Sequence, residues 1–268
     1  MATHPFPSAT RANPVQPSRS RGALAHELEQ IPWLLRLDAT ERERVLADLR
    51  VLSVEPGELL CRVGRPVTYW FGVIDGLLKM SNDNLSEDGG GIPITFTGVP
   101  SGGWFGEGTV LKNEAYRYNI QALRKSLVAG ITAGTFHWLL DRSIGFNRFV
   151  MMQLNERLGQ FIGAREIDRL TDPDERVARS LAALFHPQLY PGVGQVLRIT
   201  QQELGYLVGL GRQRVNEALT ALQAAQVIRV EYGGVRVLDL QRLRTYRTVG
   251  SRAAVHVNKL SDKEKGRR

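Results

Sequence analysis

Residues 199–228 constrain this chain most, because they have the pattern of two short helices joined by a tight turn. Thr200 and Glu203 form the capping-box signature that begins a helix. Apolar residues then recur at helical spacing, at Leu204, Leu207 and Val208. The run Gly209-Leu210-Gly211 ends that helix, since a glycine just past the last apolar position is a stop signal. A second helix is therefore predicted to begin at Arg212.

The second helix has an apolar stripe and a polar outer side. Its stripe consists of Val215, Leu219 and Leu222, with Ala218 where two helices approach closely. The polar side chains near its start are predicted to point away from the core: Arg212, Gln213, Arg214, Asn216 and Glu217. In a helix-turn-helix such residues meet base edges, Arg pairing with guanine and Asn or Gln with adenine, each worth about 1–3 kcal/mol. An ordinary helical hairpin with a solvated polar face is the alternative.

A predicted β-hairpin follows directly. Residues 227–232 alternate, Gly233-Gly234 can supply the positive φ of a tight turn, and residues 235–238 return. Residues 196–199 could form the strand that precedes the helices. This winged helix-turn-helix resembles the DNA-binding domain of the cyclic-AMP receptor/fumarate-nitrate regulator (Crp/Fnr) family of bacterial transcription factors. The resemblance rests on the sequence from Thr200 to Leu219.

Two residues depart from the pattern of that family. Gly211 stands where the family usually has a Ser that caps the recognition helix. Glycine there costs only about a few tenths of a kcal/mol, but a hydroxyl that could touch a phosphate is gone. Gln213 stands where many members have Glu. The resemblance implies DNA binding, and the departures leave the preferred operator open.

The formal net charge of +8 suggests an anionic partner, yet the charge lies at the ends of the chain. Residues 1–22 contain three Arg and no acid, and residues 241–268 contain nine basic and two acidic side chains. The ends thus have a net +10, which leaves about −2 for everything between them. They could add salt-sensitive attraction to phosphates or merely keep the protein soluble. Net charge alone is therefore weak evidence for nucleic-acid binding.

Three features favour a reducing, cytoplasmic setting. The single Cys61 excludes a disulfide within the chain and a four-thiolate iron–sulfur cluster. No apolar run reaches membrane-spanning length. The N-terminus lacks the hydrophobic stretch of a signal peptide. We therefore expect no membrane association.

The N-terminal half changes from helical to β-type patterns. Residues 1–22 are rich in Pro, Ser, Thr and Arg and are predicted to be a disordered tail, as are the basic residues 248–268. Helical patterns over 24–52 give way to short β-type runs punctuated by glycines, with a polar loop at 82–91. Several short strands with regular turns favour an antiparallel sandwich or roll, predicted over 23–142.

A long helix is predicted over 143–170. Its seam alternates four- and three-residue spacings, as in a coiled coil, which predicts a dimer interface. The predicted interface residues are Met151, Leu154, Leu158, Phe161 and Arg165. The alternative is a helix packed only on its own domain. Asp172, as an N-cap with Pro173 at the first helical position, begins the C-terminal domain, 171–247, so residues 170–173 are the predicted hinge.

A second constellation is the glycine-rich run 102–108, with Arg117 ten residues after Glu107. Such a turn could cradle a phosphate through backbone N–H groups, although a plain β-turn with a surface Arg is the alternative. In context it resembles the phosphate-binding cassette of cyclic-nucleotide-binding domains. There Gly-Glu opens a short helix, the Glu holds a ribose hydroxyl, and an Arg neutralises the cyclic phosphate. The resemblance implies effector contacts at Gly106, Glu107, Gly108 and Arg117.

Two departures count against cyclic AMP as the effector. Tyr118 follows Arg117, where the cassette normally has Ser, Thr or Ala close to the phosphate. The helix positions that meet the adenine edge in cyclic-AMP-responsive members fall on Phe161 and Ile162. Adenine hydrogen bonds lost against apolar side chains cost about 1–3 kcal/mol for each buried group. We expect weak or no response to cyclic AMP; another effector, no effector, or a differently bound cyclic dinucleotide stay open.

Other chemistries find less support. The five histidines are scattered without ligand spacing, which argues against a metal site. Haem binding through His137 is an alternative, but a partly buried helix histidine is the stronger interpretation. No nucleophile, carboxylate pair or phosphate-binding P-loop stands in a catalytic context, so no enzymatic activity is expected.

Together these patterns predict an α+β chain with an N-terminal antiparallel β-roll, a long dimerisation helix and a C-terminal winged helix-turn-helix. The resemblance implies a homodimeric regulator that binds double-stranded DNA at a pseudo-palindrome, with recognition helices about 34 Å apart, and that contacts RNA polymerase. Thr200, Gln201 and Gln202 are expected to dock on phosphates, Arg212 and Arg214 on guanine or phosphate, and Gln213 and Asn216 on bases. The alternative is a cyclic-nucleotide-binding signalling module that acts through protein contacts.

Overall fold

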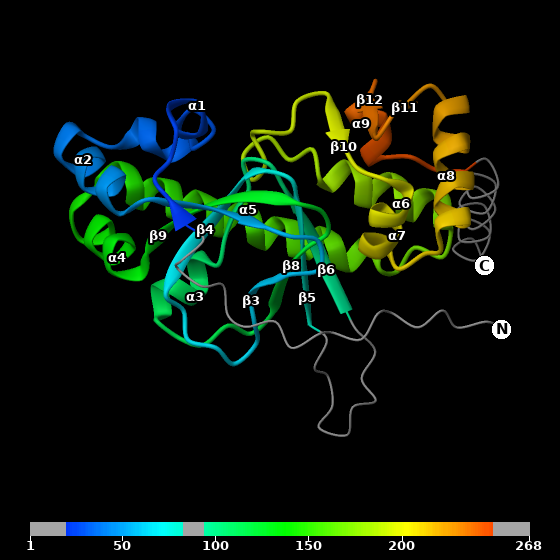
Figure 1. Ribbon diagram of the computed structural model, residues 1–268. Coiled ribbons are helices and arrows are strands. Elements are labelled where there is room, and N and C mark those ends of the chain that lie inside the picture. The colour runs from blue at the N-terminus through cyan, green and yellow to red at the C-terminus, as the bar shows by residue number, and fades with distance from the viewer. Residues whose placement is uncertain (1–19, 83–93, 249–268) are drawn as a thin grey trace, which may run out of the picture. The chain divides into compact units, whose positions relative to one another are not determined.

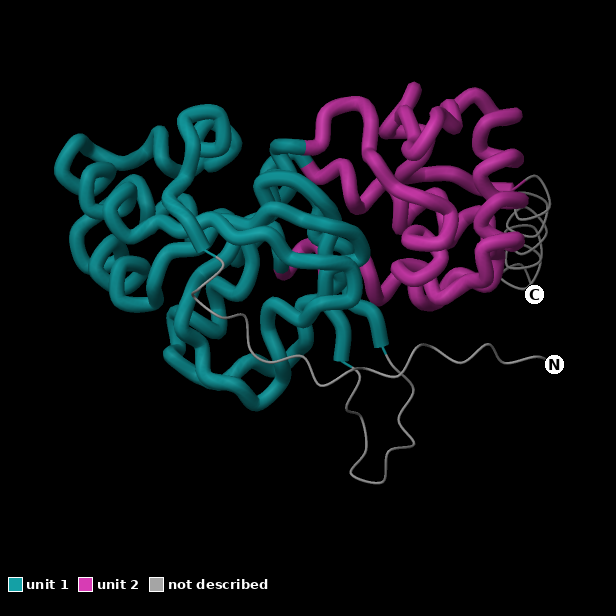
Figure 2. Tube along the Cα trace, in the orientation of Figure 1, with its two compact units in different colours: residues 1–157, 187–192 teal, residues 158–186, 193–268 magenta. Residues whose placement is uncertain are grey.

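The computed structural model describes residues 20–82 and 94–248. These residues form two compact units (Figure 2), one of residues up to 157 with 187–192, the other of residues 158–186 with those from 193 onward. The predicted tails fall almost entirely on residues 1–19 and 249–268, which lie outside the described residues. Most of the predicted polar loop lies outside them as well. Ser20 and Arg21, at the end of the predicted N-terminal tail, form strand β1.

The first unit contains two antiparallel sheets (Figure 1). The five-stranded sheet has the order β1-β2-β9-β4-β7, and the four-stranded sheet has the order β3-β8-β5-β6. The strands are β2 (Arg50–Val54), β3 (Leu59–Cys61), β4 (Tyr69–Asp75), β5 (Leu77–Asn82), β6 (Ile94–Pro100), β7 (Trp104–Phe105), β8 (Asn119–Ala122) and β9 (Ser126–Thr132). The predicted roll of short antiparallel strands is confirmed.

Helices accompany these sheets, and α5 continues into the second unit. They are α1 (Ala25–Leu28), the 3-10 helix η2 (Pro32–Arg36), α2 (Ala39–Asp48), α3 (Glu107–Lys112), α4 (Ala133–Arg142) and α5 (Ile144–Ile167). The long helix predicted from the sequence is therefore α5. No helix among the described residues is both long enough and apolar enough to span a bilayer.

Aromatic side chains fill the core between the helices and β4. Trp70 lies 5.3 Å from Trp33 and 4.3 Å from Trp104, centroid to centroid, and Phe146 at the start of α5 contacts both Trp33 and Trp70. All four side chains are buried. Gly72 leaves room for this cluster, because a Cβ there would lie 2.3 Å from the Trp104 ring. This packing fixes the first part of α5 on the sheet.

The second unit is a helix-turn-helix with a three-stranded sheet of order β10-β12-β11. Its elements are α6 (Pro173–Ala183), β10 (Val196–Arg198), α7 (Gln201–Val208), α8 (Arg212–Ala224), β11 (Ile228–Glu231), β12 (Gly234–Val237) and α9 (Leu240–Arg244). Asp172 caps α6 and Pro173 is its first residue, as predicted. Gly233 has φ +71° in the wing turn. The predicted fold class is confirmed.

Candidate nucleic-acid interface

The turn between α7 and α8 depends on a capping box and two glycines. The Thr200 hydroxyl accepts a hydrogen bond from the Glu203 backbone N–H at 3.2 Å, and the Glu203 carboxylate accepts one from the Thr200 N–H at 2.7 Å. Gly209 ends α7 at φ +69°, a conformation that favours glycine. At Gly205 a Cβ would lie 2.7 Å from the Leu210 carbonyl oxygen, so only glycine lets the turn approach α7 this closely.

One side of α8 is buried and the other is polar and exposed. The buried residues are Val215, Ala218, Leu219 and Leu222. The exposed polar residues are Arg212, Gln213, Asn216, Glu217, Thr220 and, near the end of the helix, Gln223. Gly211 leaves the start of α8 without a side-chain cap. A polar helix start presented in this way matches the groove-reading end of a recognition helix.

The structure brings several of the predicted contact residues together. Gln201, at the start of α7, donates from Nε2 to Asn216 Oδ1 at 2.6 Å. Gln213 donates from Nε2 to Glu217 Oε1 at 3.3 Å, one turn along α8. Gln202 is exposed beside Gln201. Thus Gln201, itself half-buried, joins the start of α7 to the exposed polar side of α8.

Two exposed residues of this surface were absent from the predicted contact set. Glu217 and Thr220 lie on the same side of α8 as Gln213, at spacings of four and three residues. The sequence pattern placed Glu217 on the outer side of the helix without assigning it a contact, and the helical period extended by one more turn would have found Thr220. Glu217 places a carboxylate among residues that were selected only as donors to bases and phosphates.

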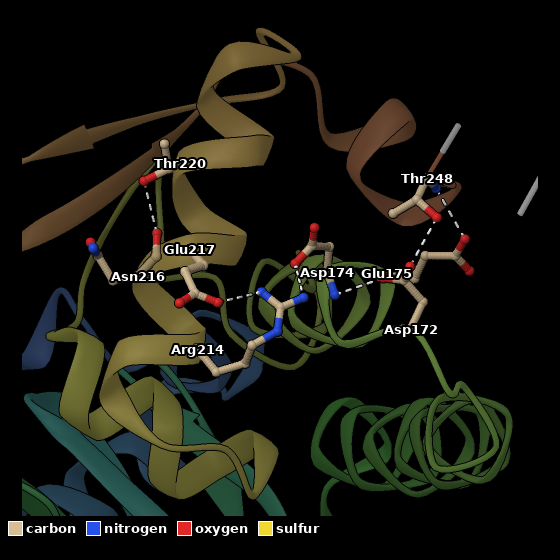
Figure 3. Close-up of polar contacts among 8 residues, drawn as sticks. All are labelled: Asp172, Asp174, Glu175, Arg214, Asn216, Glu217, Thr220 and Thr248. Carbon is tan, nitrogen blue, oxygen red and sulfur yellow. Dashed lines mark hydrogen bonds and ion pairs between the residues drawn. The ribbon is translucent and has the colours of Figure 1, made fainter. Parts of the chain in front are cut away.

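The two predicted arginines have different surroundings. Arg212 is exposed and, within the described part of the chain, no hydrogen bond or ion pair engages it. Arg214 is half-buried and lies 2.5 Å from Asp174 on α6 and 3.6 Å from Glu217 (Figure 3). The Arg212 charge is therefore available to an anion, whereas two carboxylates already neutralise that of Arg214.

The start of α6 is hydrogen-bonded to Thr248, the last described residue (Figure 3). One Asp172 carboxylate oxygen accepts from the N–H groups of Asp174 and Glu175, at 2.8 and 3.1 Å, and the other accepts from the Thr248 hydroxyl at 2.9 Å. Buried Glu175 accepts from the Thr248 N–H at 3.1 Å, with Arg247 3.9 Å away. Sequence spacing gave no sign of contacts between residues more than 70 positions apart.

The predicted effector site centres on Glu107, the first residue of α3. Gly106 precedes it at φ +85°, and Glu107 is only 3 % exposed. Its carboxylate faces Nε of Arg157, a buried residue of α5, at 3.5 Å. Arg157 also donates to the Trp104 carbonyl at 2.6 Å and to the Tyr190 hydroxyl at 3.1 Å. The carboxylate expected to hold a ribose is therefore engaged within the protein.

The arginine predicted for the cyclic phosphate lies elsewhere. Arg117 is 72 % exposed and pairs with Glu114 at 3.0 Å. Tyr118 is half-buried, and a Cβ at Gly106 would lie 3.8 Å from its hydroxyl. Burial, reinforced by the charge of Glu107, raises the pKa of the Tyr118 phenol. Gly106, Glu107 and Tyr118 thus lie close to one another. The Glu107 carboxylate faces Arg157, whereas Arg117 pairs with Glu114.

The outer side of α5 is apolar and exposed. The exposed large apolar residues are Ile144, Met151, Met152, Leu158 and Ile162. Of the predicted interface residues, Met151, Leu158 and Arg165 are exposed, and Leu154 and Phe161 are half-buried. A Leu154 methyl lies 3.9 Å from the position of a Cβ on Gly108, which shows that Leu154 faces α3.

The candidate metal and haem ligands lie apart in the described part of the chain. No group of three or more His, Cys, Asp or Glu side chains there could hold a metal ion. His137 Nε2 lies 2.9 Å from the Val110 carbonyl oxygen, to which it can donate. Cys61 is buried, and burial raises the pKa of its thiol to about 12.

Comparison with known proteins agrees with this architecture. Residues 51–143 match the family model for a cyclic nucleotide-binding domain, and residues 175–246 match that for a Crp-like helix-turn-helix domain. The cAMP-activated global transcriptional regulator CRP of Haemophilus influenzae is 24 % identical over 216 residues, which cover 75 % of this chain and 92 % of that protein.

Solved structures show the same fold. FixK2 of Bradyrhizobium japonicum superposes with a TM-score of 0.58 at 16 % identity, over 74 % of this chain and 97 % of its own. CLP of Xanthomonas campestris, described as a c-di-GMP responsive global regulator, superposes with a TM-score of 0.51 at 23 % identity, over 75 % of this chain and 99 % of its own.

Proposed function

Because the chain belongs to the Crp/Fnr family of transcription regulators, we propose that it binds a pseudo-palindromic DNA operator as a homodimer. One observation supports the DNA contact above all: the exposed polar start of α8, with the unengaged Arg212, lies opposite the buried stripe of that helix. Arg212 contacts guanine or phosphate, and Gln213 and Asn216 contact bases. Thr200, Gln201 and Gln202 at the start of α7 dock on phosphates.

The proposed dimer uses the exposed apolar side of α5. Met151 and Leu158 are seven residues apart, and both are more than half exposed in the single chain. Large apolar side chains repeated at this spacing are typical of a helix that packs against a second copy. Two protomers then present their α8 helices to successive major grooves. The proposed partners, DNA and RNA polymerase, are found in the bacterial cytoplasm, so we propose that the protein acts there.

We further propose that the effector, where one acts, is not cyclic AMP. Three observations support this: the Glu107 carboxylate is engaged by Arg157, Arg117 is exposed and paired with Glu114, and Tyr118 packs beside Gly106. A ligand at this site would have to displace a buried ion pair and bind without the cassette arginine. The similarity to a regulator described as c-di-GMP responsive makes a cyclic dinucleotide the first alternative to test.

The test is selection of bound sequences from random duplex DNA by the full-length protein, repeated with a panel of nucleotides. We expect a pseudo-palindromic consensus, bound with strong salt dependence. Arg212→Ala should cost about 1–3 kcal/mol of operator binding. Failure to enrich any sequence, or an operator affinity that Arg212→Ala leaves unchanged, would instead favour a nucleotide-binding module that acts through protein contacts.

A further inference from the structure

Arg214 is the third residue of α8, yet its guanidinium faces α6. Successive helical residues are rotated by about 100°, so Arg214 lies about 160° around α8 from Asn216. Figure 3 shows the guanidinium turned toward Asp174, with Asn216 on the other side of the helix. The pair joins positions 40 residues apart in sequence, across two helices that pack against each other. The Arg214 side chain therefore points toward α6 and links the two helices.

The acceptor of this bond is itself held in place. The backbone N–H of Asp174 donates to Asp172, whose other carboxylate oxygen accepts from Thr248. Asp174 therefore belongs to a start of α6 that is tied to Thr248, the last described residue of the winged-helix unit. A carboxylate near a helix N-terminus is also favoured by the helix dipole. Such an anchor can define the orientation of whatever pairs with it.

Arg214 has a second carboxylate neighbour, Glu217, on the outer side of α8. A carboxylate that faces the DNA phosphates is repelled by them unless a cation compensates it. Arg214 lies between the two acids, 2.5 Å from Asp174 and 3.6 Å from Glu217. It can therefore connect α8 to α6 and offset the charge of Glu217 at once, without contacting DNA.

We propose that Arg214 is a positioning residue that fixes the rotation of α8 on α6, and that Asp174, outside the helix-turn-helix, is through it a determinant of operator affinity. The inference rests on the proposed DNA binding. It assigns the two arginines of the recognition helix different tasks: Arg212 contacts DNA, and Arg214 sets the angle at which its neighbours meet the groove.

The test is a double-mutant cycle with Asp174→Asn, Arg214→Gln and both together, measured as operator affinity by fluorescence anisotropy over a salt series. Each single variant should lose about fivefold in affinity, the equivalent of about 1 kcal/mol for a partly exposed pair. The double variant should lose no more than either single variant, because both remove the same contact. The salt slope should not change, since no phosphate contact is lost.

The sign of the Asp174→Asn effect separates the two roles. Removing an acid near DNA, or freeing Arg214 to reach a phosphate, would tighten binding. Tighter binding by Asp174→Asn, with a salt slope reduced by about 1 in Arg214→Gln, would overturn the proposal in favour of a direct contact. Unchanged affinity in variants that remain folded at the assay temperature would also overturn it, because the pair would then only stabilise the fold.

Arg212→Gln is the matched control, the same substitution two residues earlier on the same helix. It should lower affinity and alter either the salt slope or the selected sequence, in contrast to Arg214→Gln. If the wild-type protein and all variants bind no selected duplex, the proposed function itself fails, which is a different outcome from any result of the cycle.

Discussion

Arg157→Met should destabilise the first unit, because it removes the only ion-pair partner of Glu107 that the structure describes. Both side chains are buried, Arg157 at 7 % exposure and Glu107 at 3 %. Methionine keeps most of the volume but leaves a buried carboxylate unpaired, which costs about 3–5 kcal/mol. The 3.5 Å separation, and the second Glu107 oxygen without a hydrogen-bond partner in the described residues, place the expected loss near the lower end.

Tryptophan fluorescence during urea unfolding isolates this effect. The chain has four tryptophans, and all belong to the first unit: Trp33, Trp70, Trp104 and Trp138. The transition midpoint should therefore report this unit alone. Combining Glu107→Gln with Arg157→Met should recover much of the loss, since no charge then remains buried without a partner. Arg117→Met makes the same substitution at an exposed arginine and should change stability by less than about 0.5 kcal/mol.

The reasoning would be refuted if Arg157→Met lost less than about 1 kcal/mol, the range of exposed pairs. It would also be refuted if adding Glu107→Gln made the protein less stable still. Either result would mean that water reaches Glu107 in solution, so that the carboxylate is free to meet a ligand. The same experiment thus bears on the effector, because a solvated Glu107 would restore one contact of the cyclic-nucleotide cassette.

Three other perturbations test the dimer, the effector and the core. Leu158→Asp should convert dimer to monomer in light scattering, while Asn155→Asp on the same helix should not; a dimer that persists in Leu158→Asp would contradict the proposed interface. Calorimetry should detect no cyclic-AMP binding tighter than about millimolar, and micromolar binding would show that Tyr118 does not obstruct the site. Burial raises the pKa of the Cys61 thiol to about 12. The stability that the buried neutral thiol contributes is therefore fully present below about pH 8.5, the usual thiol pKa, and is lost as the pH rises toward 12. In the same urea assay, a Cys61→Ala variant should lose less stability than the wild-type protein over that pH range.

The winged helix-turn-helix could be predicted because its determinants are local. The capping box joins residues three positions apart, and Gly209 takes the left-handed conformation one residue after α7 ends. The alternating hairpin is equally local, with Gly233 in its turn. Short-range hydrogen bonds and backbone sterics act in the same way whatever the rest of the chain does, so spacing alone identified these elements.

The division of α5 between its neighbours was not predictable from periodicity. Leu154 fits the four-three seam as well as Met151 or Leu158 does, yet it faces Gly108 on α3. Ile162, which the sequence assigned to the adenine-edge positions and not to the seam, is more than half exposed. A helix that serves both its own roll and a partner shares its apolar residues between two directions. The repeat gives the period of those residues, but only tertiary packing assigns each a side.

Long-range ion pairs changed the interpretation of the charged residues most. From the sequence, Glu107 and Arg214 both looked like ligand contacts, one for a ribose and one for DNA. In the fold each faces an opposite charge from another helix, Arg157 in the first case and Asp174 in the second. These partners lie 50 and 40 positions away, beyond any local pattern. A charged motif residue is therefore evidence for a ligand only where the fold leaves it unengaged.

The same criterion orders the residues of the proposed DNA surface. A cation already neutralised within the protein releases few counterions from DNA, so the salt dependence of binding should reflect the unengaged arginines. Arg212 meets this condition at the start of α8, and Arg214 does not. Since the chain between its basic ends has a net charge of about −2, a charge average over the fold would not reveal an affinity for DNA. Any attraction from the folded part of the chain would have to come from a few exposed cations in defined places, so the proposed DNA contact depends on the orientation of α8 on α6 as well as on the residues that α8 presents.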